Sequence, residues 1–235
     1  MTAPVVLVHG GGFASQCWDR LLPHLDTPVI AVDLPGRGRR PADLRTVTLA
    51  DCARAIVADA DMAGFDEVVL AGHSLAGCSL PAAVGLLGAR ALHAVFIGAT
   101  VPPSGTSSFD TLDPEIQQMA REGAEPDALG VMDAATATMM FGNDLDEEQL
   151  AWCLGQMVPE APKLIFEPVD LSPLRGVPCT WMRTLHDAIV SAPKQARFAA
   201  NIPECDVVDV DAAHMCMISK PAETAAILNE IAARY

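Results

Sequence analysis

A serine in a tight turn between glycines is the strongest chemical signal in this sequence. Ser74 stands in the segment Gly-His-Ser-Leu-Ala-Gly, directly after the apolar run 68–71 and before a helical stretch. On such a strand-to-helix turn the hydroxyl rises above the edge of the sheet, beside backbone N–H groups that can stabilise an oxyanion. The usual pattern, Gly-x-Ser-x-Gly, has glycine where this chain has Ala76, which is larger by one methyl group. We expect Ser74 to act as a nucleophile, with an accidental turn as the alternative.

A second turn, rich in glycine, follows the first apolar run. The segment 9–13 reads His-Gly-Gly-Gly-Phe, and consecutive glycines let a backbone approach a ligand closely. We predict that the N–H groups of Gly11 and Leu75 hold a substrate oxyanion, with Gly12 as the alternative to Gly11. A phosphate-binding turn is disfavoured because no Gly-Lys-Ser/Thr ending follows. The remaining alternative is a tight turn without a chemical role.

A serine hydroxyl becomes a good nucleophile only when a base takes its proton. His214 follows the last predicted strand, on a loop at the same carboxyl edge of the sheet as Ser74, and is our candidate base. His9 and His73 adjoin the two glycine turns and are expected to support them. The other histidines fall on a predicted helix, at a strand start and in a loop, and are His24, His93 and His186.

The imidazole in turn needs a carboxylate that fixes its tautomer and stabilises its positive charge. Asp187 follows a predicted strand and lies between the serine and His214, in the chain order Ser, Asp, His. Asp209 and Asp211 are rivals, but they lie too near the histidine along the chain to reach its outer ring nitrogen easily. Asp33 closes another strand and is expected to organise its own turn. We therefore assign the acid to Asp187.

Short apolar runs alternate with helical patterns, which predicts a parallel sheet covered by helices on both faces. The predicted strands are 5–8, 29–32, 68–71, 94–97, 179–183 and 207–210. The predicted helices lie near 15–25, 48–63, 75–88, 190–200 and 220–234. Pro81 should kink the third helix, because it removes one hydrogen bond. The fold class is α/β, with a mostly parallel central sheet flanked by helices and an inserted helical cap.

The cap is predicted from a change of pattern between residues 100 and 176, where prolines punctuate short amphipathic segments without a convincing strand. We expect residues 1–100 and 177–235 to form the core and residues 101–176 the helical cap insertion. Apolar cap residues, among them Met140 and Phe141, could line a substrate pocket or form the cap's own core. The predicted substrate-binding set is Gly10, Gly12, Met140, Phe141 and Met215.

Composition limits the partners. Of the 235 residues, 51% are hydrophobic and 19% charged, which excludes a disordered chain. Fifteen basic residues stand against 30 acidic ones, for a net charge of -15, and this disfavours nucleic-acid and anionic-membrane surfaces. The one basic cluster is expected to be a solvated loop and comprises Arg37, Arg39 and Arg40.

Cysteine usage and hydropathy point to a cytoplasmic protein without a membrane segment. Seven dispersed cysteines without a zinc-type spacing indicate reduced thiols, and the N-terminus has no basic region typical of an export signal. The 22 uncharged residues 68–89 could suggest a membrane span. They contain glycines and a proline, and divide better into a strand, a turn and a helix.

With these pieces in place, the chain resembles the α/β-hydrolase fold family over nearly all of its length. The matching pieces are His9 to Gly12 with Trp18, Asp33 to Gly36, Gly72 to Leu75, Asp187, and His214 to Pro221. The tail segment and the start at an interior strand most resemble the branch of plant methyl-ester hydrolases and hydroxynitrile lyases, with bacterial relatives. The branch has Asp where Ala213 stands and usually Gly where Ala76 stands. Neither position belongs to the predicted catalytic triad of Ser74, His214 and Asp187.

The resemblance implies a serine hydrolase of the carboxylesterase type, acting on a small, largely apolar ester without a metal or cofactor. Lyases of the same branch carry a lysine directly after the triad histidine and a hydroxyl-bearing residue after the first-strand histidine. Here Met215 and Gly10 occupy those positions, so a lyase is the second interpretation. A step in a biosynthetic pathway would use the same residues, and a catalytically silent ligand-binding protein of this fold also stays open. The expected partner is the small-molecule ester, with no nucleic acid or membrane; a homodimer stays open.

Overall fold

The chain folds around a six-stranded sheet in which every neighbouring pair of strands is parallel. The computed structural model describes residues 2–123 and 131–235. The strands are β1 (Val5–Val8), β2 (Val29–Val32), β3 (Val68–His73), β4 (Ala91–Ile97), β5 (Cys179–Thr184) and β6 (Cys205–Val210), in the spatial order β2-β1-β3-β4-β5-β6. The predicted sheet is confirmed: β1 and β2 have the predicted bounds, and the other strands extend by one to three residues.

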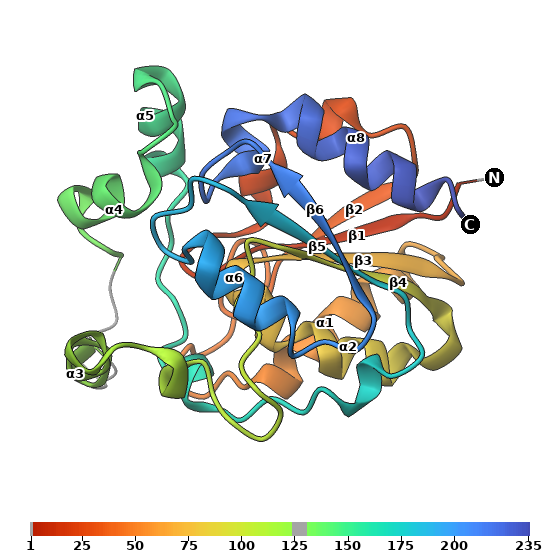
Figure 1. The fold of residues 1–235 in the computed structure, drawn as a ribbon, viewed down its shortest axis with the longest axis horizontal. Helices are drawn as coiled ribbons and strands as arrows, with labels where there is room; N and C mark the ends of the chain where they lie inside the picture. Colours follow the sequence, from red (N-terminus) through yellow and green to blue (C-terminus); the bar gives the residue numbers. More distant parts are fainter. Residues whose placement is uncertain (1, 124–130) are drawn as a thin grey trace.

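Helices cover both faces of the sheet (Figure 1). One face carries α1 (Leu49–Met62), α2 (Leu80–Leu87) and α6 (Ala192–Ala199), and the other carries α7 (Cys216–Ser219) and α8 (Pro221–Ala232). Successive residues of β1 point to opposite faces: Val6 and Val8 pack with α1 and α2, whereas Val5 and Leu7 pack with α8. All four side chains are fully buried. A parallel strand with helices on both sides has no solvent face, which explains its uninterrupted apolar sequence.

The first predicted helix, at 15–25, is wrong as a continuous helix. The segment forms two short 3₁₀ helices, Ser15–Trp18 and Leu22–His24, and Pro23 lies inside the second. Proline lacks an N–H and clashes with the carbonyl four residues earlier, so an α-helix cannot run through this position undisturbed. The predicted helices at 48–63, 190–200 and 220–234 are confirmed as α1, α6 and α8, each slightly shorter than predicted.

The predicted helix at 75–88 is divided, and the kink expected at Pro81 does not occur. A 3₁₀ helix covers Ser74–Cys78, and α2 begins afresh at Leu80. Pro81 therefore lies in the first turn of α2, where a backbone N–H has no acceptor inside the helix. The proline starts the helix instead of bending it. The stretch 68–89 thus forms a strand, a turn and a helix, as predicted.

A long connection between β4 and β5 forms an insert beside the carboxyl ends of the strands (Figure 1). The α-helices in the described part of this insert are α3 (Pro114–Gly123), α4 (Ala134–Phe141) and α5 (Glu147–Gly155). The side chain of Asp133 caps the N-terminus of α4, and Asp146 caps α5 through a reciprocal capping box with Gln149. Both proposed cap boundaries, 101 and 176, fall within this connection.

The basic cluster after β2 is not a uniformly solvated loop, and the prediction is wrong for Arg37. This residue is only 2% exposed, and its guanidinium pairs with Glu160 of the insert at 3.0 Å. Arg39 has a largely exposed side chain, and Arg40 is partly buried against Asp59. The acidic partner of Arg37 is more than 100 residues away along the chain, so local charge patterning could not reveal the burial.

All seven cysteines are free thiols, and all except Cys205 are buried. Burial raises the pKa of the Cys78 thiol to about 12, so this group stays a small apolar side chain. Within residues 2–123 and 131–235, every helix is too short or too polar to cross a membrane.

Candidate active site

Ser74 sits at the point where β3 turns into the following 3₁₀ helix, in a backbone conformation with φ of 53°. A positive φ is unfavourable for a residue with a side chain, so the turn holds Ser74 in a strained backbone conformation. Two glycines make the turn sterically possible. A carbon added at Gly10 would lie 2.8 Å from Cβ of Ser74, and one added at Gly72 would lie 2.6 Å from Leu80. The missing side chain at Gly10 lets the turn after β1 approach Ser74, and the one at Gly72 lets α2 pack against β3.

Three side chains from separate segments form one hydrogen-bonded line. Nε2 of His214 lies 3.0 Å from Oγ of Ser74, and Nδ1 of the same ring lies 2.7 Å from Oδ2 of Asp187. Each residue comes from a loop at the carboxyl end of a parallel strand: β3, β5 and β6. The sheet thus brings together the three residues that the sequence analysis selected. An imidazole between a hydroxyl and a carboxylate can move a proton away from the hydroxyl.

Asp187 is fixed by several donors besides the histidine. Its Oδ1 accepts the N–H groups of Ile189 and Val190, each at 2.8 Å, and its Oδ2 also accepts the Thr184 hydroxyl at 3.0 Å. Burial by itself would raise the pKa of Asp187, but the interaction with His214 and the hydrogen bonds from the Val190 and Ile189 N–H groups outweigh it and hold the pKa below its usual value. The carboxylate therefore stays ionised and keeps its orientation.

The rival acids point elsewhere. Asp209 pairs with Arg183 at 2.7 Å, and Asp211 lies 2.7 Å from Nε2 of His186. Asp33 accepts the N–H of Ser15 at 2.9 Å and that of Arg39 at 3.0 Å, and so organises the turn after β2, as expected. Asp187 is the acid that contacts the ring of His214.

His9 and His73 support the surrounding backbone. The Leu34 N–H donates to Nε2 of His9, so the proton of this ring is on Nδ1, which donates to the Gly10 carbonyl. Nε2 of His73 donates to the carbonyl of His214 at 2.8 Å. Burial lowers the pKa of His9 to about 4 and that of His73 to about 3, so both rings are neutral near pH 7.

A cavity of about 530 Å³ opens over the serine. Its wall includes Ser74, His214 and four residues named from the sequence as ligand contacts: Gly11, Gly12, Met140 and Phe141. The insert supplies most of the remaining apolar lining, namely Val131, Met132, Met157, Val158 and Ile165. A cavity of this size and polarity suits a small, mostly apolar molecule.

Gly10 and Met215 do not line this cavity, and this corrects the predicted substrate-binding set. Met215 is fully buried in the core cluster on the α8 side of the sheet. Gly10 lies against Cβ of Ser74, where its missing side chain makes room for the serine. Met215 thus turns its side chain into the core, and Gly10 has no side chain to present to a ligand.

The two expected oxyanion donors lie on the cavity wall beside the serine. Leu75 is at the start of a 3₁₀ helix, where a backbone N–H has no acceptor within the helix. Gly11 belongs to the glycine turn on the opposite side. The alternative donor, the Gly12 N–H, already donates to Oε2 of Glu160 at 2.9 Å. This geometry favours Gly11 over Gly12 for the role.

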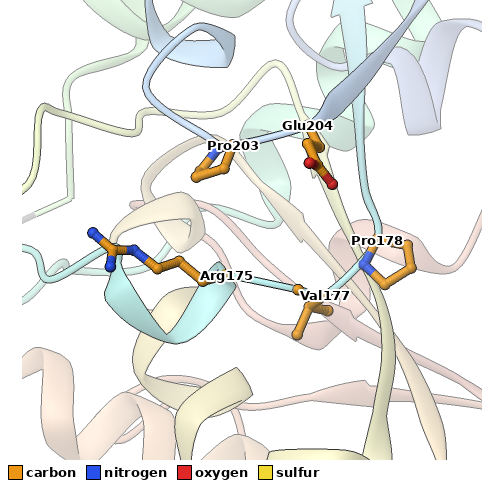
Figure 2. Close-up of a pocket in the computed structure, with 6 residues that line it drawn as sticks. Arg175, Val177, Pro178, Pro203 and Glu204 are labelled. Atoms are coloured by element: carbon orange, nitrogen blue, oxygen red, sulfur yellow. The ribbon is translucent and has the colours of Figure 1, made fainter.

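A second hollow lies at the opposite, amino end of the sheet, between the segments that lead into β5 and β6 (Figure 2). Its lining residues are Arg175, Gly176, Val177, Pro178, Pro203 and Glu204. Figure 2 shows the side chains of Arg175 and Glu204 on different sides of this hollow. Ser74 follows the carboxyl end of a strand in the same parallel sheet, so the hollow is remote from Ser74.

Sequence reasoning missed three polar residues that support the site. Gln195 is fully buried and bonds through its amide to Thr184, which donates to Asp187. Asp144 of the insert holds the loop before His214, and Glu160 holds Gly12. None of them stands in a recognisable motif, because each acts through a partner that is distant in sequence. The partners of these side chains lie 11, 69 and 148 residues away along the chain, which leaves no local signal.

Comparison with known proteins shows the family to which this chain belongs. The sequence profile described as the Alpha/beta hydrolase family matches residues 5–227. The chain belongs to the alpha/beta hydrolase family. Methylesterase 7 of Arabidopsis thaliana is 25% identical to this alpha/beta hydrolase, with 98% of this chain and 96% of the relative covered. Norfluorocurarine synthase 2 of Strychnos nux-vomica is 28% identical, with 97% and 94% covered.

A solved structure shows the same fold. The extracellular alpha/beta-hydrolase from a Paenibacillus species, described as sharing structural and functional homology with tobacco salicylic acid binding protein 2, superimposes with a TM-score of 0.86. The two sequences are 19% identical, and the match covers 97% of this chain and 98% of the other. The predicted resemblance to the α/β-hydrolase fold and to plant methyl-ester hydrolases is thus confirmed for this alpha/beta hydrolase.

Proposed function

We propose that this protein is a serine carboxylesterase that cleaves a small, largely apolar ester. The observation that carries the proposal is the continuous line from Ser74 through His214 to Asp187, which opens on an apolar cavity. A nucleophile with its base and an oriented acid is the arrangement that acyl transfer requires. Relatives named as methylesterases support the same reaction class.

In the first half-reaction, Nε2 of His214 takes the proton of the Ser74 hydroxyl while Oγ attacks the ester carbonyl. The carbonyl π bond opens and the negative charge moves to its oxygen, where the N–H groups of Gly11 and Leu75 stabilise it. The imidazolium, held by the ionised Asp187, then protonates the leaving alcohol as the C–O bond breaks. An acyl group remains on the serine.

In the second half-reaction, water replaces the alcohol. His214 takes a proton from the water, whose oxygen attacks the acyl carbonyl and forms a second oxyanion at the same donors. Collapse of this intermediate breaks the bond to Oγ of Ser74, which regains its proton from the imidazolium. The free acid leaves, and the enzyme returns to its starting state without any redox change.

A cyanohydrin lyase is the weaker interpretation. Stabilising a departing cyanide calls for a positive charge next to the base, and Met215, directly after His214, is fully buried in the core. Among the described residues that line the cavity there is neither lysine nor arginine.

We also infer that the protein acts in the cytoplasm, in keeping with its free thiols.

The decisive experiment compares the wild type with Ser74→Ala on a series of p-nitrophenyl and alkyl esters of graded size, with mandelonitrile included. We expect ester hydrolysis to fall by about 10³-fold or more in the variant at unchanged Tm, because the triad acts as a unit. A fluorophosphonate probe should label Ser74 in the wild type. Cleavage of mandelonitrile in preference to every ester would reverse the assignment, and a serine that never reacts with the probe would leave a ligand-binding role.

A further inference from the structure

Glu160 reaches from the insert into the wall of the cavity that contains Ser74. Its Oε2 accepts the N–H of Gly12 at 2.9 Å. A carbon added at Gly11 would lie 3.4 Å from the same oxygen, so the carboxylate lies directly against the glycine turn. The side chain is 24% exposed, which puts it at the boundary between cavity and interior. No step of the proposed reaction uses this acid.

The other carboxylate oxygen of Glu160, Oε1, is held by Arg37 and by a backbone N–H group. Nη2 of Arg37 lies 3.0 Å from Oε1 of Glu160, and the Ala161 N–H donates to that oxygen at 2.5 Å. Nη1 of Arg37 donates to the carbonyl of Pro35 at 2.7 Å, and its side chain is only 1% exposed. Because either charge alone would be poorly solvated in the interior, the fixed guanidinium of Arg37 keeps the carboxylate of Glu160 in the paired position.

Val158, two residues before Glu160, holds the carbonyl group of Gly12. The Val158 N–H donates to the Gly12 carbonyl at 2.9 Å, and Gly12 adopts a φ of 75°, a conformation that favours glycine. Residues 158 and 160 therefore fix the peptide groups before and after Gly12. The peptide that joins Gly11 to Gly12 has little freedom left, and it adjoins the N–H proposed to bind the oxyanion.

We propose that Glu160, anchored by Arg37, is a positioning residue that keeps the glycine turn in the conformation in which the Gly11 N–H faces the reacting carbonyl. The inference rests on the proposed function and deepens it. Arg37 has a second effect: it neutralises the carboxylate. An unpaired anion beside the oxyanion donors would oppose the negative charge that develops on the substrate oxygen.

The first test replaces Glu160 by alanine and by glutamine. We expect Glu160→Ala to lower kcat by about 10- to 100-fold with little change in KM, because a displaced donor weakens transition-state binding. Labelling of Ser74 by the fluorophosphonate should slow in parallel, since its phosphoryl oxygen needs the same donors. Glu160→Gln keeps an oxygen that can accept the Gly12 N–H but turns an amide NH2 toward Arg37 and the Ala161 N–H, so we expect a smaller loss than in Glu160→Ala.

The second test separates the charge from the hydrogen bond. Arg37→Met leaves Glu160 without its cation, and we expect kcat and the labelling rate to fall. Adding Glu160→Gln to that variant removes the unpaired charge and should recover much of both. This comparison also covers the case in which Glu160→Ala does not fold. If the double variant is as slow as Arg37→Met alone, the electrostatic part of the proposal is wrong.

Glu167→Ala is the matched control. Glu167 is also an acid of the insert that accepts a core N–H, that of Leu49 at 3.2 Å, but it does not line the cavity. This control should lose stability without losing kcat. If Glu160→Ala behaves in the same way, Glu160 is only a structural tie, and the inference is overturned while the esterase assignment stands. If the wild type hydrolyses no ester through Ser74, the proposed function itself has failed.

Discussion

Oδ2 of Asp144 accepts a hydrogen bond from the backbone N–H of Ala213, the residue directly before His214, at 2.7 Å. The same oxygen accepts the hydroxyl of Ser219, also at 2.7 Å. Because Asp144 belongs to the insert, the insert holds the loop of the base from the outside as well as lining the cavity. The position of His214 thus depends on two parts of the chain that meet only in the folded protein.

Replacing Asp144 by alanine leaves the Ala213 N–H without its acceptor. We expect a loss of about 1–3 kcal/mol in the free energy of unfolding, the usual cost of an unsatisfied buried polar group. We also expect a fall of about 10-fold in kcat, because small displacements of a base are expensive. Urea unfolding and steady-state kinetics measure the two effects. Ser219→Ala removes only the second donor and should cost less on both measures; equal losses would contradict this account.

The role of the Asp187 charge can be tested with the isosteric substitution Asp187→Asn. In Asp187→Asn the amide no longer stabilises the imidazolium and favours the wrong tautomer of His214, so kcat should fall by about 10⁴-fold. Circular dichroism should show an unchanged fold. Asp209→Asn is the control, because this exposed acid pairs with Arg183 and not with the base. A decrease of less than about 10-fold in Asp187→Asn would remove this residue from the proposed triad.

The insert should set the size limit of the substrate. Met140 lines the cavity and is partly buried, whereas Met139 next to it is 73% exposed and does not line it. Met140→Ala enlarges the site, and we expect kcat/KM for longer acyl chains to rise relative to acetate by about 10-fold or more, the usual effect of one methylene group in an apolar pocket. Met139→Ala is the matched control. An identical chain-length profile in both variants would mean that Met140 does not contact substrate.

Three buried histidines should make the fold sensitive to acid. Burial lowers the pKa of His9 and His93 to about 4 and of His73 to about 3, against an ordinary value of 6.5. Above pH 6.5 these groups contribute their full stability. Below it the unfolded chain takes up protons that the folded chain does not, so stability falls with pH by about 1.4 kcal/mol per unit for each histidine.

The experiment measures the free energy of unfolding in urea between pH 7 and pH 4.5. Asp187, whose pKa is lowered from 3.8, contributes only below this window. His93 lies away from the serine, bonded to Thr180 and Tyr235. His93→Asn should therefore reduce the slope by about one proton without changing esterase activity at pH 7.5. The difference between the two proteins is decisive, because Glu160 and Glu167, whose pKa values burial raises, contribute the same opposing slope to both. If His93→Asn leaves the slope unchanged, the His93 ring is not held neutral in the folded state.

Much of this molecule is determined locally. Val5–Val8 and Val29–Val32 could be bounded from sequence because parallel strands are apolar on both faces and end abruptly at turn residues. The serine turn could be recognised because its backbone demands small residues at fixed spacing. The chain order of Ser74, Asp187 and His214 then selected the triad candidates. The strand and turn signals each lie in a few neighbouring residues, whereas the triad signal is the order of three residues along the chain.

Other features exist only in the tertiary structure. Two contacts join segments that are far apart along the chain: the pair of Arg37 with Glu160, and the hydrogen bond from the Ala213 N–H to Asp144. The burial of Met215 depends on how the helices pack against the sheet. Local rules misjudged Arg37 and Met215 for that reason. A side chain's type and its neighbours decide which helix or strand it enters, but its charge state, partners and access to the cavity depend on what the rest of the chain brings next to it.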